Sequence, residues 1–181
     1  VGLNSINNVV DITNFIMMDL GQPLHAFDVA KLKGAKIIVD KAKTGEAFKT
    51  LDGTDMTLTG DELTIRDQER AVCIAGAIGG QNSGVTETTT DLFIESAHFA
   101  MDSVRRTARR HGLQTDSAYR FSRGTDISGV KRALDRACAL IQQVAGGEVA
   151  ADEWDIQGKA KPARSIAISA DFVGQKLGYK V

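Results

Sequence analysis

The 181-residue sequence has few cysteines, almost no net charge and no long apolar run, and each absence narrows the class of protein. The two cysteines, Cys73 and Cys138, lie far apart in apolar segments. We therefore expect buried free thiols in a reducing cytosol rather than a disulfide or a metal pair. No apolar run approaches the roughly 18 residues that cross a bilayer, and no signal peptide is recognisable. A formal net charge of -1 does not indicate a general polyanion binder, although charge can gather locally.

What is present is typical of a globular domain. The chain is 43% hydrophobic and 25% charged, which is enough apolar material for one sizeable core. It begins without a methionine and ends in what resembles the start of another module, so we expect a fragment of a longer protein. We predict one main domain over residues 1–157, with 158–181 as a linker and a truncated further module.

Short strand patterns fill the middle of the chain and helical patterns flank them, which predicts an α+β fold. The first helix is expected over residues 5–20, capped by Ser5 and ended by Gly21. Two more helices are expected at 102–111 and 128–145, the second capped by Asp126. Strands are expected at 36–40, 47–51, 56–58, 63–66, 71–75, 92–95 and 151–156. A strand and a helix at 164–169 and 170–177 are expected to belong to the further module.

His25 follows the end of the first helix and lies close to Pro23, in what we expect to be an irregular loop. A histidine beside a conformationally fixed proline can be held rigidly in a site. It can equally be a partly buried histidine that hydrogen-bonds the backbone, and the residue alone favours that simpler interpretation.

Glycines crowd the stretch 76–84, where backbone N–H groups can approach a ligand without side chains in the way. The stretch lacks both the P-loop lysine and the dinucleotide-binding spacing. A tight crossing between strands explains the glycines as well, and spacing alone favours it.

Glu95 ends the apolar strand that begins at Leu92. A carboxylate at a buried strand end is costly unless it has a partner, so it is a candidate for recognising a donor group on a ligand. A salt bridge to a nearby arginine is the alternative.

Arginines gather in a twenty-residue stretch of an otherwise neutral chain: Arg105, Arg106, Arg109, Arg110, Arg120 and Arg123. Helical spacing stacks them in like-charged pairs, which favours an anionic partner such as phosphate. The alternative is a solvated helix face paired with Asp102, Asp116 and Asp126. Aromatic residues are sparse there, so stacking of single-stranded bases is weakly indicated.

Thr115 and Ser117 lie between two expected helices, where hydroxyls can cap a turn or line a pocket. Turn chemistry is the better interpretation of the residues alone. Histidine and cysteine never occur at metal-ligand spacing, so no metal site is expected. No nucleophile-elbow sequence supports a catalytic triad either.

Taken together, the ordered motifs resemble a known family. They are Asn8–Asn14, Gly21–Asp28, Leu51–Gly53, Ala75–Gly80, Ser83–Val85, Arg109–Leu113, Thr115–Ser117 and Arg120–Gly124. Over about residues 1–157 the chain is similar to the B3/B4 region of the bacterial phenylalanyl-tRNA synthetase beta subunit, and residues 164–181 resemble the start of the next module, B5.

The resemblance implies a B3/B4-type fold and an editing hydrolase that removes tyrosine wrongly attached to tRNA(Phe). It implies catalytic roles for His25, Asn14 and the Gly76 amides. The substrate-binding residues would be Thr13, Glu95, Thr115 and Ser117. The phosphate-binding candidates are Arg105, Arg109 and Arg110. A pocket for phenylalanine rejects an added hydroxyl only about a hundredfold, whereas a second site that requires the hydroxyl discriminates much better.

The resemblance also implies the setting of the reaction. The parent enzyme is expected to be a cytoplasmic α2β2 ligase with an alpha subunit, tRNA(Phe), ATP and Mg²⁺, none of the cofactors being held by this fragment. Two positions depart from the family, since Ser117 replaces a common alanine and Ser122 a common glutamate. The alternative function is a non-catalytic module that docks tRNA or a subunit.

Overall fold

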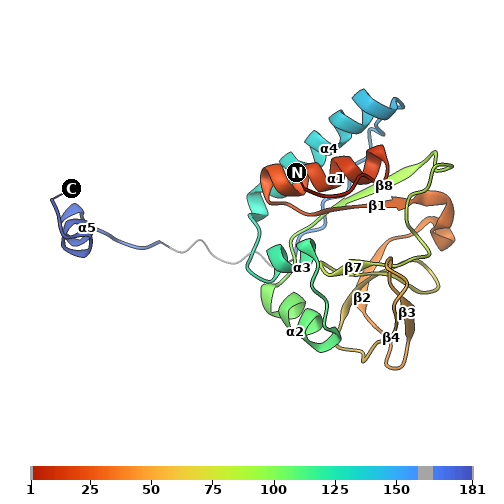
Figure 1. Cartoon of the computed structure of the whole chain (residues 1–181), viewed down its shortest axis with the longest axis horizontal. Helices are drawn as coiled ribbons and strands as arrows, with labels where there is room; N and C mark the ends of the chain where they lie inside the picture. The colour runs from red at the N-terminus through yellow and green to blue at the C-terminus, as the bar shows by residue number, and fades with distance from the viewer. Residues whose placement is uncertain (1, 159–164, 181) are drawn as a thin grey trace. The chain divides into compact units, whose positions relative to one another are not determined.

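The computed structural model describes residues 2–158 and 165–180 of the chain. The chain divides into two compact units, Val1–Val149 and Ala150–Val181, which are described separately below. The first unit contains the strands of the described residues and the helices labelled α1 to α4 in Figure 1.

Helix α1 spans Asn8–Leu20, three residues shorter at its start than the sequence predicts. The predicted cap was wrong: the Asn7 side chain accepts a hydrogen bond from the Val10 N–H, while the Ser5 hydroxyl binds the Asp11 carboxylate. The predicted end is confirmed, because Gly21 takes the left-handed conformation (φ 71°) that closes the helix.

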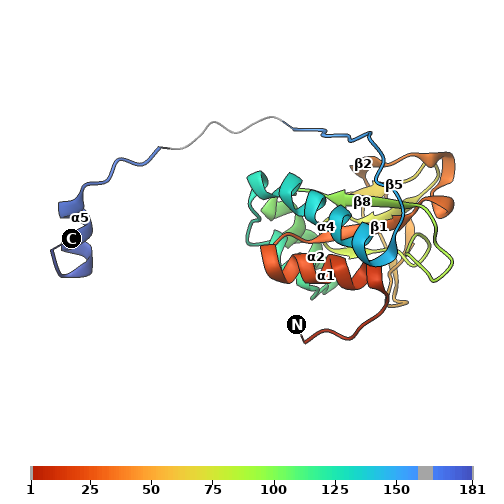
Figure 2. The same cartoon turned by 90° about the horizontal axis from the view of Figure 1, so that it is seen from above.

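Strand β1, Leu24–Asp28, pairs antiparallel with β8, Leu92–Ser96. Helix α4, Val130–Ala145, lies beside α1, and both helices cover this pair of strands (Figures 1 and 2). Apolar side chains of α1 and α4 meet in a small core of their own, formed by Ile12, Ile16, Ala133 and Ala137. Two alanines on α4 let the helices approach closely.

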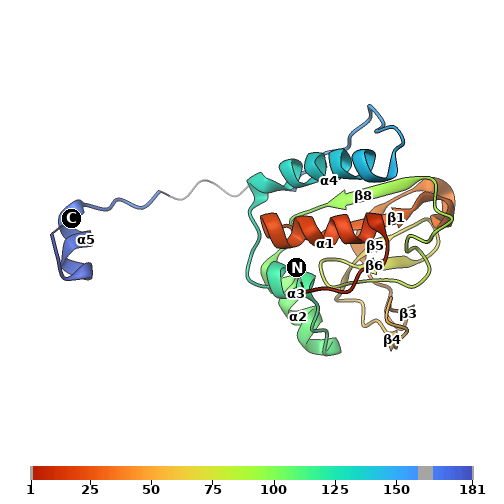
Figure 3. The ribbon, with the colours of Figure 1, turned by 45° about the horizontal axis from the view of Figure 1, so that its top comes forward.

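The other face of the β1–β8 pair looks toward a four-stranded antiparallel sheet in the order β2-β5-β6-β7 (Figure 3). Its strands are Ile38–Lys41, Leu63–Arg66, Ala71–Ile74 and Ile78–Gly79. A separate hairpin joins β3, Ala47–Lys49, to β4, Asp55–Thr57. Short 3-10 turns at Val29–Lys31 and Lys33–Ala35 connect β1 to β2.

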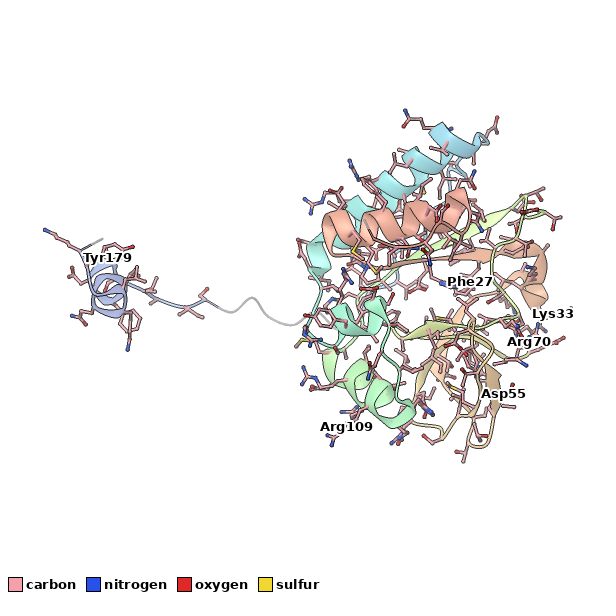
Figure 4. All side chains as sticks on the ribbon, in the orientation of Figure 1. Phe27, Lys33, Asp55, Arg70, Arg109 and Tyr179 are labelled. Atoms are coloured by element: carbon pink, nitrogen blue, oxygen red, sulfur yellow. The ribbon has the colours of Figure 1, made fainter. Side chains whose placement is uncertain are left out.

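The main core lies between the sheet and the β1–β8 pair. Phe27, labelled in Figure 4, is fully buried in this core, which also contains Val72 and Ile74 of β6. Fully burying one such side chain stabilises the fold by about 1.5–3 kcal/mol. The α+β class predicted from the sequence is therefore confirmed.

Helix α2, Met101–His111, agrees with the predicted helix and ends at Gly112 in the left-handed conformation. The sequence missed α3, Asp116–Phe121, which has only six residues. A 3-10 turn at Ile127–Gly129, capped by the Asp126 side chain as predicted, leads into α4. Neither cysteine forms a disulfide with a described residue, and Cys73 is buried whereas Cys138 is half-buried.

The second unit contains helix α5, Ala170–Leu177, where a helix was predicted. The Ser169 hydroxyl caps it by accepting a hydrogen bond from the Phe172 N–H. The predicted strand at 151–156 is wrong, because these residues form no strand. The predicted strand at 164–169 is also wrong over 165–169, and residue 164 lies outside the described part of the chain.

Candidate functional site

His25 lies in strand β1, directly opposite Glu95 in β8. The predicted loop position of His25 is therefore wrong. Residues that oppose each other in antiparallel strands project their side chains from the same face, with Cα atoms about 4.5–5.5 Å apart. Phe27, two residues further along β1, points the same way and contacts the His25 ring edge-to-face at 4.4 Å. Strand pairing thus brings an imidazole and a carboxyl together on the inner face.

A hollow of about 50 Å³ opens in front of this pair. His25, Glu95, Gly76 and Ser117, all predicted as site residues, line it together. Two aromatic rings form part of its wall, Phe99 after β8 and Phe121 at the end of α3, with ring centroids 5.1 Å apart. We call this space the β1–β8 hollow.

Neither polar group facing the β1–β8 hollow has its hydrogen-bonding needs met. The buried Nε2 atom of His25 has no partner within the described residues. No hydrogen bond reaches the Glu95 carboxyl from the described part of the chain either, and burial raises the pKa of Glu95 to about 7. Burial lowers the pKa of His25 to about 4, so near neutral pH the imidazole is uncharged. Both groups are thus available to a ligand.

The Cys73 thiol is a third titratable group at the hollow, although its sequence pattern predicted only a buried free thiol and no part in a site. Burial raises the pKa of this thiol, and the negative charge of ionised Glu95 raises it further. The thiol therefore stays protonated and serves as wall rather than as a nucleophile.

Gly79 makes room for His25. A Cβ atom at this position would lie 2.6 Å from the His25 Cε1 atom and 2.7 Å from the Leu51 Cδ1 atom. Only glycine lets β7 pass this close to the imidazole, so the glycine-rich stretch serves both strand crossing and the site.

Gly76 combines a left-handed backbone (φ 69°) with tight packing, since a Cβ atom there would lie 2.9 Å from Phe99. Its N–H group donates no hydrogen bond to any described residue. An amide in this state can donate to an oxyanion placed in the hollow.

The other predicted pocket residues lie outside this lining. Thr13 is buried in α1, where its hydroxyl donates to the Val10 carbonyl at 2.8 Å. Asn14 is half-buried on the same helix. Thr115 caps α3, and its hydroxyl donates to the carbonyl of Ala77, a lining residue, at 2.6 Å. Thr115 therefore shapes the wall of the hollow without facing it.

The predicted phosphate-binding arginines differ in how far they are already paired. Arg105 donates to the Ser122 carbonyl at 2.7 Å and lies 3.7 Å from Asp102, so a backbone oxygen at position 122 serves as its partner. Arg110 contacts Asp61 at 2.8 Å. Arg109 is exposed and has no ion pair with a described residue, and Figure 4 labels it on α2.

The described residues contain no group of three or more histidine, cysteine, aspartate or glutamate side chains placed to hold a metal ion. No helix in the described ranges is both long and apolar enough to pass through a membrane.

Comparison with known proteins places these features in a family. The model of the B3/4 domain family matches residues 1–146. The chain is 54% identical over 180 residues to a phenylalanine–tRNA ligase beta subunit of Bdellovibrio bacteriovorus, covering 99% of this chain and 22% of the relative. A beta subunit of Geobacter sulfurreducens is 49% identical over 181 residues, with 100% and 23% covered. The chain thus spans less than a quarter of the length of these relatives.

A solved structure agrees in fold. The N-terminal fragment of the phenylalanyl-tRNA synthetase beta subunit from Pyrococcus horikoshii superposes with a TM-score of 0.54 at 16% identity. The match covers 96% of this chain and 51% of that one. At this identity the similarity shows the fold alone.

Proposed function

Because the chain belongs to the B3/4 domain family, we propose that it is the editing region of a phenylalanine–tRNA ligase beta subunit and hydrolyses tyrosine esterified to tRNA(Phe). The observation that carries the proposal is the pair formed by His25 and Glu95 on the inner face of β1 and β8. Both groups face one hollow, and both lack a hydrogen-bond partner among the described residues.

Glu95 is the group that recognises the tyrosine hydroxyl. A half-buried carboxyl without a protein partner favours a ligand that supplies one and penalises a phenylalanine ring, which would cover the carboxyl and leave it unsatisfied. Its pKa of about 7 allows either form near neutral pH to bind a phenol, the ionised form accepting a hydrogen bond and the protonated form donating one. Phenylalanine can do neither.

His25 and Gly76 act on the ester. An uncharged imidazole with a free Nε2 atom can orient a water molecule at the carbonyl carbon. The free Gly76 N–H can donate to the oxygen on which negative charge develops. Since an ester is already more reactive than an amide, placing the water and the oxyanion accounts for much of the acceleration.

We assign a supporting role to two residues of α1, Asn14 and Thr13. Helix α1 packs against β1, and Ser117 of α3 contacts the Met17 thioether at 3.9 Å. The α1 side chains can therefore set the position of the wall against which the ester lies. Thr115 acts in the same way through the Ala77 carbonyl.

The β1–β8 hollow has to widen before it can hold a tyrosyl group. Its volume of about 50 Å³ is far below the roughly 300–1,000 Å³ of ordinary small-molecule sites. Ser117 belongs to the short helix α3, which meets α1 through two contacts with methionine sulfur. The Ser117 hydroxyl lies 3.9 Å from the Met17 sulfur, and the Arg120 guanidinium lies 3.1 Å from the Met18 sulfur. Opening of the hollow by movement of α3 away from α1 would break both contacts.

The whole protein implied by this proposal is a cytoplasmic ligase. It would pair with an alpha subunit in an α2β2 assembly, bind tRNA(Phe) and use ATP and Mg²⁺ for aminoacylation. We assign none of the residues of this chain to those cofactors. The chain contributes the second, proofreading reaction.

The test is a deacylation assay on the complete enzyme that contains this chain, with Tyr-tRNA(Phe) and Phe-tRNA(Phe) as substrates. Glu95→Ala is expected to lower the preference for tyrosine roughly ten- to a hundredfold, the range for a hydrogen bond that involves a charged group. Glu95→Gln, which keeps an acceptor and a donor, is expected to retain part of the preference.

Glu87→Gln is the matched control, because it makes the same chemical change at an exposed glutamate. An unchanged preference in Glu95→Ala would remove Glu95 from the proposal. If His25→Ala and Glu95→Ala both left deacylation intact, the chain would instead be a non-catalytic docking module.

A further inference from the structure

A second hollow, of about 140 Å³, lies between helix α2 and the ends of β2 and β5. Its lining comes from Lys41, Asp61, Ser103, Arg106, Thr107 and Arg110. We call it the α2 hollow. It shares no lining residue with the β1–β8 hollow, and it has space for several water molecules.

One face of α2 supplies four of the lining residues. Ser103, Arg106, Thr107 and Arg110 follow the spacing of three and four residues that places side chains on the same side of a helix. The opposing wall comes from Lys41 at the end of β2 and from the turn before β5. The arginines already lie close together in the sequence, whereas Lys41 comes near them only through the fold.

Of the three cations at the α2 hollow, only Arg110 is already neutralised. Its guanidinium contacts Asp61 at 2.8 Å and the buried Glu62 at 3.4 Å. For Arg106 and for the Lys41 ammonium group, the described residues supply neither an ion pair nor a hydrogen-bond acceptor. The helix dipole does not stabilise Arg106 either. Cations interact favourably with the dipole in the last turn of a helix, and Arg106 lies before the last turn of α2.

The two hydroxyls of the hollow also have no partner within the described residues. Thr107 is only 5% exposed, yet its hydroxyl forms no hydrogen bond within the described ranges. The same holds for the half-buried Ser103 hydroxyl. Neither hydroxyl oxygen is sealed away from the hollow, so both hydroxyls can donate a hydrogen bond to a ligand bound there.

From this set of groups we propose that the α2 hollow binds a phosphate group. Two unpaired cations supply charge, and the Arg106 guanidinium offers the planar pair of donors that matches two phosphate oxygens. The Ser103 and Thr107 hydroxyls donate to the remaining oxygens. A metal ion is excluded by the excess of positive charge over Asp61, and the lining has no aromatic side chain on which a nucleobase could stack.

The phosphate can come from a free phosphate ion or from the backbone of an RNA. Two binding measurements on the complete protein distinguish these sources, both at constant ionic strength set with chloride. Inorganic phosphate is titrated by phosphorus NMR, and a short fluorescein-labelled single-stranded RNA by fluorescence anisotropy. The site lies apart from the proposed hydrolytic site, so deacylation of Tyr-tRNA(Phe) can fail while phosphate binding succeeds, and the reverse.

Arg106→Gln is the decisive variant, and Arg109→Gln is its matched control. Both remove one positive charge from an exposed, unpaired arginine of α2, but only Arg106 lines the hollow. Arg106→Gln is expected to weaken binding about tenfold or more, as for the loss of charge-assisted hydrogen bonds, whereas Arg109→Gln has little effect. Lys41→Gln is expected to act like Arg106→Gln, and circular dichroism verifies the fold of each variant.

Binding of inorganic phosphate with this pattern supports the proposal and shows that the free ion suffices. Binding of RNA alone with this pattern also supports it and identifies a phosphodiester as the source. Equal weakening by Arg106→Gln and Arg109→Gln overturns the proposal, because diffuse charge would then explain the affinity. Failure of both ligands to bind overturns it as well.

Discussion

Replacing Glu95 by glutamine is expected to make the protein more stable, and by an amount that grows with pH. Burial raises the pKa of Glu95 from 4.5 to about 7 in the folded chain. Between pH 4.5 and about 7 the Glu95 carboxyl is ionised in the unfolded chain but still protonated in the folded chain. Folding therefore becomes less favourable as pH rises through this range. Glutamine is neutral at every pH, so the variant does not lose stability in this way.

The size of the effect follows from the two pKa values. One unit corresponds to about 1.4 kcal/mol, and most of the loss accumulates between pH 5 and pH 8. The stability of Glu95→Gln relative to the unmodified protein should therefore increase by about 2–3 kcal/mol between these pH values. In the unmodified protein His25 masks part of the trend. Its pKa is lowered from 6.5 to about 4, which costs stability as pH falls through that range.

Urea unfolding followed by far-ultraviolet circular dichroism at pH 5 and pH 8 measures the difference directly. Subtracting the free energies of unfolding of the two proteins at each pH removes the contribution of every group they share. Glu87→Gln is the control, because it makes the same substitution at an exposed glutamate. A difference for Glu95→Gln that does not change with pH would refute the burial argument.

Two further predictions test the packing around the site. Gly79→Ala is expected to lower the free energy of unfolding in urea by about 1–3 kcal/mol, because the new Cβ would lie 2.6 Å from the His25 ring. Gly158→Ala is the control and should leave stability unchanged, because a Cβ at this position has open space around it. Burial raises the pKa of Glu62, but hydrogen bonds from His111 and its neighbours outweigh this and lower it to about 2. Glu62→Ala should therefore cost about 3–5 kcal/mol at pH 7, and unfolding curves should show that cost shrinking as pH falls from 4.5 toward 2.

The sequence correctly predicted the helix ends that are marked by a particular residue type. Gly21 and Gly112 end α1 and α2 in the left-handed conformation, and both ends were predicted. Such signals depend on local backbone geometry, which a single residue type can reveal. The same holds for Asp126, whose side chain caps the turn before α4.

The elements that the sequence missed depend on partners far along the chain. His25 was expected in a loop because β1 follows Pro23 closely and pairs with β8, about seventy residues later. Strand β7 has two residues and lies within the glycine-rich stretch, where pattern cannot separate a strand from a turn. Helix α3, with six residues, is too short to display helical periodicity.

The candidate sites show the same division. Motif order pointed to His25, Gly76, Glu95 and Ser117, which the fold gathers around one hollow. No sequence pattern pointed to the Phe99 and Phe121 rings or to Cys73. The α2 hollow was equally hidden, because Lys41 and Arg106 are separated by more than sixty residues and meet only when α2 packs beside the end of β2.

Under the proposed editing function, the narrowness of the β1–β8 hollow bears on which form of tyrosine the protein can bind. If only a minor, widened population accepts the side chain, the apparent affinity for free tyrosine falls by the fraction of molecules in that population. A tyrosine tethered to docked RNA instead arrives at an effective concentration of about millimolar order. A hollow that resists opening would thus bind free tyrosine weakly, and the protein would respond only to tyrosine attached to RNA.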